Sequence, residues 1–336
     1  MAERLLVYFD RRLVGAADAG PDGRLTFAYD EAWLGDGEAF AISQSLPLRA
    51  GRVRSTAAQA FFANLLPEGA VREAVARQLG LSADNDVALL AALGGDCAGA
   101  LTILPDPLTP QELPAEWEPL PDAAIAEMAR RYSVLATLTG RRAVRLSLAG
   151  AQDKLPVRRD ETGGLHLPLN GAPSTHILKV PSRDFKHLPA NEVLLTHLAR
   201  AAGLSTVDIE LRVVEDVPVA LVRRYDRVVQ GDDVTRLHQE DLCQALGLPP
   251  RTKYETEGGP SFADAMRLVR AASDEPLPDA AQLLRWLVFV VLAGDADGHG
   301  NPKRSSRESG GPNTKEFARF CARHCSGREA ELKDRQ

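Results

Sequence analysis

The sequence has few cysteines, no excess of positive charge and no long apolar run, and each shortage excludes a class of protein. The four cysteines of the 336-residue chain, Cys97, Cys243, Cys321 and Cys325, lack the spacing of a disulfide framework. A formal net charge of −6 argues against a chain that wraps nucleic acid by bulk charge. The N-terminus has no signal-peptide pattern, and the longest dense apolar run, 283–293, contains Arg285 and is shorter than the ~20 residues that span a bilayer. These shortages predict a cytoplasmic globular protein with reduced thiols and no membrane contact.

The remaining composition and its patterns predict an α+β fold. Hydrophobic residues make up 44% of the chain and charged residues 26%, a balance that supports a buried core. Alternating apolar residues near the N-terminus predict strands, while helical spacing begins at Thr56 with a stop at Gly80 and recurs over 86–93. Residues 98–104 again read as a strand. A cluster of prolines then predicts a linker over 106–121, so that 1–105 forms an N-terminal α+β module.

Beyond the linker we expect a strand-rich lobe over 122–236 and a partial helical lobe over 237–302. Strands are predicted at 145–148, 154–158, 165–167, 176–180, 209–214 and 217–223, and helices at 122–132 and 191–202. The apolar run at 283–293 is expected to be a strongly buried helix. A strand lobe joined to a helical lobe by one connection is the architecture that this order indicates.

Small residues at 147–154, between two predicted strands, form the first candidate site. They let the backbone approach a ligand closely, and successive amides can cradle phosphate oxygens while Lys154 adds a positive charge. An ordinary hairpin turn explains the same pattern, because one glycine is weak evidence. The stretch alone leaves both interpretations open.

Lys179 forms the second candidate site because it lies inside an apolar strand. A buried ammonium is costly unless it is paired, and Glu192 in the following helix is a candidate partner. A strand lysine paired with a glutamate of the next helix is how protein kinases hold the phosphates of ATP. The alternative is that Glu192 lies in the first turn of its helix and simply favours the positive end of the helix dipole.

The segment 294–301 (GDADGHGN), directly after the apolar run, is the third candidate site. An aspartate there can accept the proton of an attacking hydroxyl, and an asparagine shortly after can hold magnesium. Two alternatives remain: a fragment of a metal-hydrolase site, which lacks further ligands nearby, and a solvated helix cap. The cap does not explain two aspartates and a histidine so close together.

These segments together resemble the HipA-like serine/threonine kinases, the toxin half of type II toxin–antitoxin pairs. The matching segments are 146–154 (LSLAGAQDK), 174–181 (STHILKVP), 191–192 (NE), 224–227 (RYDR), 238–247 (HQEDLCQALG), 253–255 (KYE), 258–260 (GGP) and 297–299 (DGH), with 43–48 (SQSLPL) and 61–67 (FFANLLP) nearer the N-terminus. Several ordered motifs are far more specific than one glycine loop. The resemblance implies a bilobal protein-kinase-like fold.

The resemblance also implies a role for each candidate residue, with ATP and Mg²⁺ as cofactors. The phosphate loop would consist of Ala149, Gly150, Ala151, Gln152, Asp153 and Lys154. Lys179, with Glu192, would bind ATP phosphates, and the hinge touching adenine would be Arg223, Arg224 and Tyr225. Asp297 would be the catalytic base, His299, Gly300 and Asn301 would lie beside the nucleotide, and Asn301 would be the magnesium ligand. Ser147 would be autophosphorylated, and its phosphate could expel the phosphate loop.

Partners follow from the same resemblance. Family members phosphorylate proteins of translation, with an aminoacyl-tRNA synthetase as a typical target, and so arrest growth. A small helix-turn-helix antitoxin (HipB-like) neutralises them and carries the pair to operator DNA. The modest acidity of this chain is consistent with contact to DNA mainly through such a partner.

The sequence departs from the family pattern after His299. The family's catalytic loop has its asparagine five places after the aspartate, whereas Asn301 is four places after Asp297. The only later aspartate is Asp334, although kinases use a second aspartate to hold magnesium. Residues 303–336 contain one leucine and no valine or isoleucine, so we expect a disordered tail on a truncated or frameshifted kinase.

Three outcomes follow for this sequence. The first is a kinase of the family type whose turnover is weak or absent. The second is a catalytically dead module that binds the antitoxin and acts as a corepressor. The third is a poorly folded remnant, in which lost packing in the helical lobe exposes the apolar helix at 283–293.

Overall fold

The computed structural model describes residues 4–20, 23–53, 56–131, 144–145, 148, 152–183, 185–252 and 258–294. The N-terminal module contains a four-stranded antiparallel sheet in the order β3-β2-β1-β4. Its strands are β1 (Arg4–Phe9), β2 (Arg12–Ala19), β3 (Leu25–Tyr29) and β4 (Leu101–Pro105). Its helices are α1 (Glu31–Leu34), α2 (Thr56–Ala63), α3 (Gly69–Leu79) and α4 (Asp86–Leu93). The predicted α+β fold class is confirmed.

The helical pattern that begins at Thr56 is interrupted before its predicted stop at Gly80. Residues 64–68 separate α2 from α3, because Pro67 has no amide hydrogen and disfavours helical backbone at the residue before it. The stop itself is confirmed, since Gly80 ends α3 in the left-handed conformation with φ 66°. The prediction of helix at 86–93 is also confirmed, and Asn85 caps α4 by accepting the Ala88 amide.

A six-stranded antiparallel sheet forms the second part of the molecule, in the order β5-β7-β6-β8-β10-β9. Its strands are β5 (Glu116–Pro119), β6 (Lys154–Arg159), β7 (Leu165–Leu169), β8 (His176–Lys179), β9 (Ile209–Val214) and β10 (Val217–Arg223). Helices α5 (Asp122–Arg130) and α7 (Leu188–Ala201) pack on β9 and β10. The segment predicted as a linker therefore also supplies an edge strand, β5, which pairs with β7.

Most of the strand predictions for this lobe agree with the structure. The bounds of β9 and β10 are those predicted, and β6, β7 and β8 differ from the prediction by one or two residues. The strand predicted at 145–148 is not formed at Arg145 and Leu148, and residues 146–147 lie outside the described part. A short hairpin of β11 (Arg227–Gln230) and β12 (Asp233–Arg236) follows the sheet.

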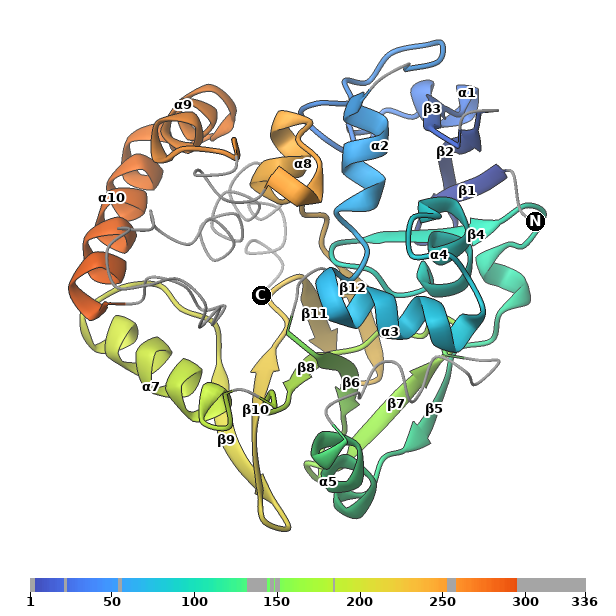
Figure 1. Ribbon diagram of the computed structural model, residues 1–336. Coiled ribbons are helices and arrows are strands. Elements are labelled where there is room, and N and C mark those ends of the chain that lie inside the picture. Colours follow the sequence, from blue (N-terminus) through green and yellow to red (C-terminus); the bar gives the residue numbers. More distant parts are fainter. Residues whose placement is uncertain are drawn as a thin grey trace.

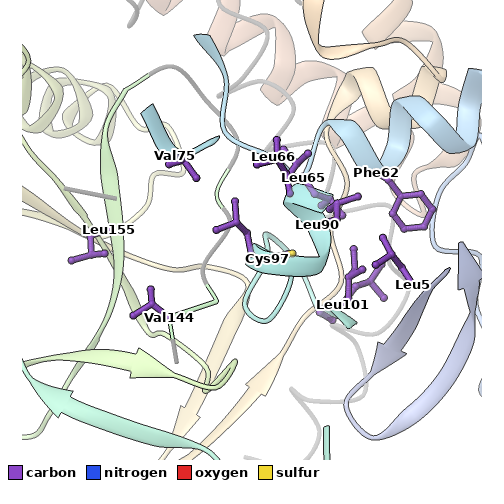
Figure 2. Packing of buried hydrophobic residues seen from close by; sticks show 14 of the residues in the cluster. Leu5, Phe62, Leu65, Leu66, Val75, Leu90, Cys97, Leu101, Val144 and Leu155 are labelled. Carbon is purple, nitrogen blue, oxygen red and sulfur yellow. The ribbon is translucent and has the colours of Figure 1, made fainter. Parts of the chain in front are cut away.

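One apolar core joins the N-terminal module to the strand-rich lobe. The same buried cluster contains Leu5 and Phe62 of the module and Leu155, Leu178 and Leu221 of the lobe. Figure 2 shows Cys97 and Leu90 between the side chains of the two parts. The two parts therefore fold against each other over a shared interior and are not joined by the linker alone.

The helical part contains α8 (Leu242–Leu246), α9 (Phe262–Ala272) and α10 (Pro276–Ala293). Short 3-10 turns lie at Pro110–Glu112, before β5, and at Pro250–Thr252, after α8. Helix α8 packs on α2, and α9 packs on α10. In Figure 1, α9 and α10 lie at the side of the molecule opposite the N-terminal sheet. Capping boxes begin α8 at Asp241 and α9 at Ser261.

The prediction of a strongly buried helix at 283–293 is wrong. Within α10 only Asp279 and Leu283 are buried, whereas Val291 is 66% and Leu292 80% exposed. The apolar residues of α10 are exposed, as expected from the sequence for a helical lobe with incomplete packing. By length and composition this helix is also apolar enough to cross a membrane, with a mean hydropathy of 1.3 over 18 residues. One such helix is weak evidence for a membrane protein, and α10 packs on α9 through Leu283 and Val269.

Candidate nucleotide site

Lys179 ends β8 in the middle of the six-stranded sheet and is 6% exposed. Its Nζ donates a hydrogen bond to Oε1 of Glu192 on α7, and the two side chains form a largely buried ion pair. The predicted pairing is confirmed. A buried ammonium with a carboxylate partner keeps its charge at a defined position, which an unpaired lysine in an apolar strand would not do.

The alternative explanation of Glu192 is wrong. Helix α7 begins at Leu188, three residues before the predicted start, and its first turn holds no acidic residue. Glu192 therefore lies in the second turn, beyond the strongest field of the helix dipole. Pro189 explains the earlier start, since its fixed φ suits the first turn of a helix.

The register of the sheet places Lys154 directly opposite Lys179. Strand β6 begins at Lys154 and pairs with β8 so that these two lysines are partners, while Ala220 is the partner of Lys179 on β10. Directly opposed residues of antiparallel strands extend from the same face of the sheet. The end of the predicted phosphate loop and the predicted phosphate-binding lysine are thus neighbours. Strand β6 begins and strand β8 ends at these two lysines, so two positively charged residues meet at this end of the strand pair, which favours an anion.

Gln152 and Asp153 precede Lys154 in an irregular segment. The side-chain Nε2 of Gln152 is buried and donates no hydrogen bond within the described part of the chain. A buried amide donor of this kind is costly unless an acceptor reaches it. The residues that precede it in the predicted loop, Ala149, Gly150 and Ala151, lie outside the described residues, as does Ser147.

The three residues of the predicted hinge differ in burial. The side chain of Arg223 is 55% exposed, but Arg224 is 2% exposed and points into the protein. Its guanidinium donates to Asp226 (2.9 Å to Oδ1), to Ser174 Oγ (2.9 Å) and to the carbonyl of Cys97 (2.9 Å). The Arg224 side chain is therefore committed to the interior, so only the backbone of this position is left for contact with adenine. Tyr225, the third hinge residue, is partly buried.

A buried charge cluster lies behind the hinge, and the sequence did not predict it. It consists of Asp96, Asp226, Arg224, Arg227 and Arg236, all under 9% exposed. Burial alone would raise the pKa of Asp96, but Arg227, Arg224 and Arg236 outweigh burial and hold it below its usual range. Burial and the neighbouring Arg224 lower the pKa of Arg227 to about 10. The sequence signal is an aspartate between the glycine pair 94–95 and Gly99, directly after the helical pattern of 86–93.

The third candidate site lies outside the described residues. Helix α10 ends at Ala293, and Gly294 caps it in the left-handed conformation with φ 65°. Asp297, His299, Gly300 and Asn301 follow beyond the described part, so their predicted roles stay predictions. No group of three or more metal-ligating side chains occurs among the residues that the structure describes.

A strand-rich lobe whose central lysine is paired with a glutamate of the following helix is typical of the nucleotide lobe of protein kinases. The chain belongs to the HipA-like family: residues 5–104 match the HipA N-terminal domain and residues 146–301 the HipA-like C-terminal domain. The fold is correspondingly similar to HipA in the solved complex of HipA, HipB and operator DNA from Shewanella oneidensis. The TM-score is 0.74 at 25% identity, with 93% of this chain and 75% of that chain covered.

Among curated proteins the chain is similar to two Sinorhizobium fredii proteins whose names assign them provisionally to the kinases. Y4mE is 43% identical over 89% of this chain and 73% of its own length. Y4dM is 29% identical over 83% of this chain and 66% of its own length. The serine/threonine-protein kinase toxin HipA of Shewanella oneidensis is 30% identical over 82% of this chain and 65% of its own length. The chain thus spans between about two thirds and three quarters of the relatives that it matches.

Proposed function

We propose that this protein is an ATP-dependent serine/threonine protein kinase of the HipA toxin type. The observation that carries the proposal is the buried pair of Lys179 and Glu192, with Lys154 opposite Lys179 in the register of β6 and β8. Family membership and the kinase toxin among the relatives support the same function. By resemblance, the substrate is a translation protein such as an aminoacyl-tRNA synthetase, and its phosphorylation arrests growth.

The described residues fit the phosphates of a nucleotide. Glu192 holds the Lys179 ammonium in place, so that the ammonium can donate further hydrogen bonds without losing its partner. Lys154 supplies a second positive charge from the same face of the sheet. The buried amide of Gln152, at the mouth of the loop, is a donor suited to a phosphate oxygen. Neighbouring cations and preorganised donors stabilise charge in a site shielded from water.

The remaining roles belong to residues beyond the described part. When bound, ATP supplies the phosphoryl group and Mg²⁺, for which Asn301 is the candidate ligand, offsets the charge of its phosphates. Asp297 accepts the proton of a substrate serine or threonine hydroxyl. Ser147 is the candidate autophosphorylation site, where a phosphate would add negative charge beside the phosphate loop. His299 and Gly300 would lie next to the nucleotide.

The test of this proposal is a radiolabelled ATP assay on the purified chain, compared with Asp297→Ala. Phosphorylation that disappears in Asp297→Ala supports the kinase and the predicted role of Asp297 as the base. Phosphorylation that survives in Asp297→Ala overturns the role of Asp297, and its absence from the unsubstituted chain overturns the kinase.

The second candidate function is an antitoxin-binding corepressor without catalysis. The similar solved structure is a complex of HipA with HipB and operator DNA, and the N-terminal module of this chain has a complete sheet and a buried core. In this function a small HipB-like helix-turn-helix protein binds the chain and contacts the operator. Co-purification with that protein, without detectable phosphotransfer, favours the corepressor over the kinase.

A further inference from the structure

The loop 94–99 of the N-terminal module reaches the hinge and the start of β8. Asp96, in this loop between α4 and β4, is 0% exposed. Its Oδ2 accepts hydrogen bonds from Ser174 Oγ (2.6 Å) and the Ser174 amide (3.2 Å), and its Oδ1 accepts one from Arg227 Nη2 (2.7 Å). Ser174 lies two residues before β8, the strand that ends at Lys179. One carboxylate of the N-terminal module thus binds Ser174, just before β8, and Arg227, just after the predicted hinge.

The hinge is attached to the same point through Arg224. Arg224 Nη1 contacts Asp96 Oδ2 at 3.3 Å, and the Arg224 amide donates to the carbonyl of Thr175 at 3.0 Å. Asp226 faces the loop as well, because its Oδ2 accepts the Gly99 amide at 2.8 Å. Contacts with the loop 94–99 therefore hold the segment 224–227 on the side that faces the protein interior.

The loop is shaped for this close contact. A side chain at Gly95 would meet Cβ of Arg145 at 2.7 Å and Cα of Gly171 at 2.9 Å. Because one of these neighbours is backbone, a larger residue would push the loop away from the lobe. Residue 95 is next to Asp96, so the glycine allows the carboxylate to reach Ser174.

Asp96 forms ion pairs with all three arginines of the cluster. Three guanidinium groups, of Arg224, Arg227 and Arg236, face two carboxylates, of Asp96 and Asp226. The register of the β11–β12 hairpin sets Arg227 opposite Arg236, so both stay beside Asp96. Loss of one carboxylate would leave three buried cations with a single counter-charge, which is strongly unfavourable.

We propose that Asp96 is a positioning residue for the nucleotide site, through which the N-terminal module fixes the backbone at 224–227, which includes the predicted hinge residues Arg224 and Tyr225, and the entrance to β8. The proposal rests on the proposed function, since it assigns to Asp96 the geometry of the site that would hold ATP. It makes nucleotide affinity depend on a side chain that does not touch the nucleotide.

The test is the substitution Asp96→Asn, which keeps the size of the side chain and removes its charge. We expect binding of a fluorescent ADP analogue to weaken about tenfold or more, because the hinge loses its anchor. The matched control is Asp86→Asn: Asp86 is another carboxylate of the N-terminal module with an arginine partner, its side chain is 14% exposed, and its partners Arg72 and Gln59 lie within the module. Asp86→Asn is expected to lower the melting temperature and leave nucleotide affinity unchanged.

Two further variants keep the test decisive if Asp96→Asn folds poorly. Ser174→Ala removes one hydrogen bond to Asp96 without changing charge, and we expect a few-fold loss of affinity. Adding Arg227→Met to Asp96→Asn restores the original net charge of the cluster and should recover part of the affinity. Equal affinity in Asp96→Asn, Ser174→Ala and the unsubstituted protein would overturn the proposal, as would losses in Asp86→Asn and Asp96→Asn that simply follow their melting temperatures.

Hydrogen exchange separates failure of this proposal from failure of the kinase function. Asp96→Asn should speed exchange of the Arg224 amide, which is bonded to Thr175, and Asp86→Asn should not. If the unsubstituted protein binds no nucleotide, the proposed function fails and the role at a nucleotide site fails with it, and faster exchange at Arg224 then shows only that Asp96 anchors this backbone. If it binds nucleotide and Asp96→Asn changes neither affinity nor exchange, the positioning role alone fails.

Discussion

The strand-rich part of the molecule and its helical part use the same apolar residue types with different results. Most buried apolar residues from Leu5 to Leu221 share one large cluster, whereas α8 to α10 bury only small groups such as Leu242 with Ala265 and Val269 with Leu283. Helix α10 is as apolar as a core helix and yet exposes most of its leucines and valines. An apolar sequence therefore shows that a helix is more stable against a partner surface, but it does not show that such a surface is present.

The largest effect on stability is expected from a truncation inside the shared core. Leu90 of α4 is 0% exposed, so Leu90→Ala should lower the free energy of unfolding by about 2–5 kcal/mol. The loss combines the transfer of the removed carbons with the cavity that they leave. Denaturant unfolding followed by circular dichroism measures it, and a loss below about 1 kcal/mol would show that the core is less well packed than the structure indicates.

A smaller effect is expected at the junction between the two regions, where Glu240 lies beside the loop 43–46. Burial raises the pKa of Glu240 to about 7, although hydrogen bonds from Ser43 and the Gln44 amide lower it. Because the folded state holds this proton more tightly than the unfolded state, the contribution of Glu240 to stability is present below about pH 4.5 and is lost as pH rises through 7.

Glu240→Gln should remove this pH-dependent loss of stability, which is about 3 kcal/mol in the free energy of unfolding between pH 4.5 and pH 8. The measurement is the free energy of unfolding across that range, with the exposed Glu73→Gln as the control. A pH profile of Glu240→Gln that superimposes on that of the unsubstituted protein would contradict the buried, protonated carboxyl.

The smallest effect is expected from the same leucine truncation made on α10. Leu292 is 80% exposed, so Leu292→Ala should change the free energy of unfolding by less than about 0.5 kcal/mol. The polar variant Leu292→Gln should instead raise the protein concentration at which light scattering detects aggregates, because the exposed apolar stripe shrinks. If Leu292→Ala lowers the free energy of unfolding about as much as Leu90→Ala does, then α10 is covered in solution.

Local patterns predicted what depends on neighbours in sequence. The short apolar runs at 209–214 and 217–223 predicted the bounds of β9 and β10, and the cost of burying a lone ammonium predicted the pairing of Lys179 with Glu192. The burial of Arg224 could not be predicted in this way, because its partner Asp96 is 128 residues away and nothing near either residue reveals the other. Pro67 was a visible signal for the break between α2 and α3, but helical spacing on both sides obscured it.

The exposure of α10 could not be decided from its own sequence for a related reason. Its apolar spacing is the same whether or not a partner surface covers it. The same pattern therefore led to two conflicting predictions, a buried helix and an exposed one. The roles of Asp297 and Asn301 rest on the family resemblance and lie beyond the described residues.

The central claim is that Lys179, held by Glu192, binds the phosphates of a nucleotide. The most direct measurement is equilibrium binding of a fluorescent ADP analogue to the unsubstituted protein and to Lys179→Met, with the exposed Lys186→Met as the control. The account predicts saturable binding that Lys186→Met retains and Lys179→Met weakens at least tenfold. Equal binding by Lys179→Met and the unsubstituted protein, or no binding by either, would contradict it.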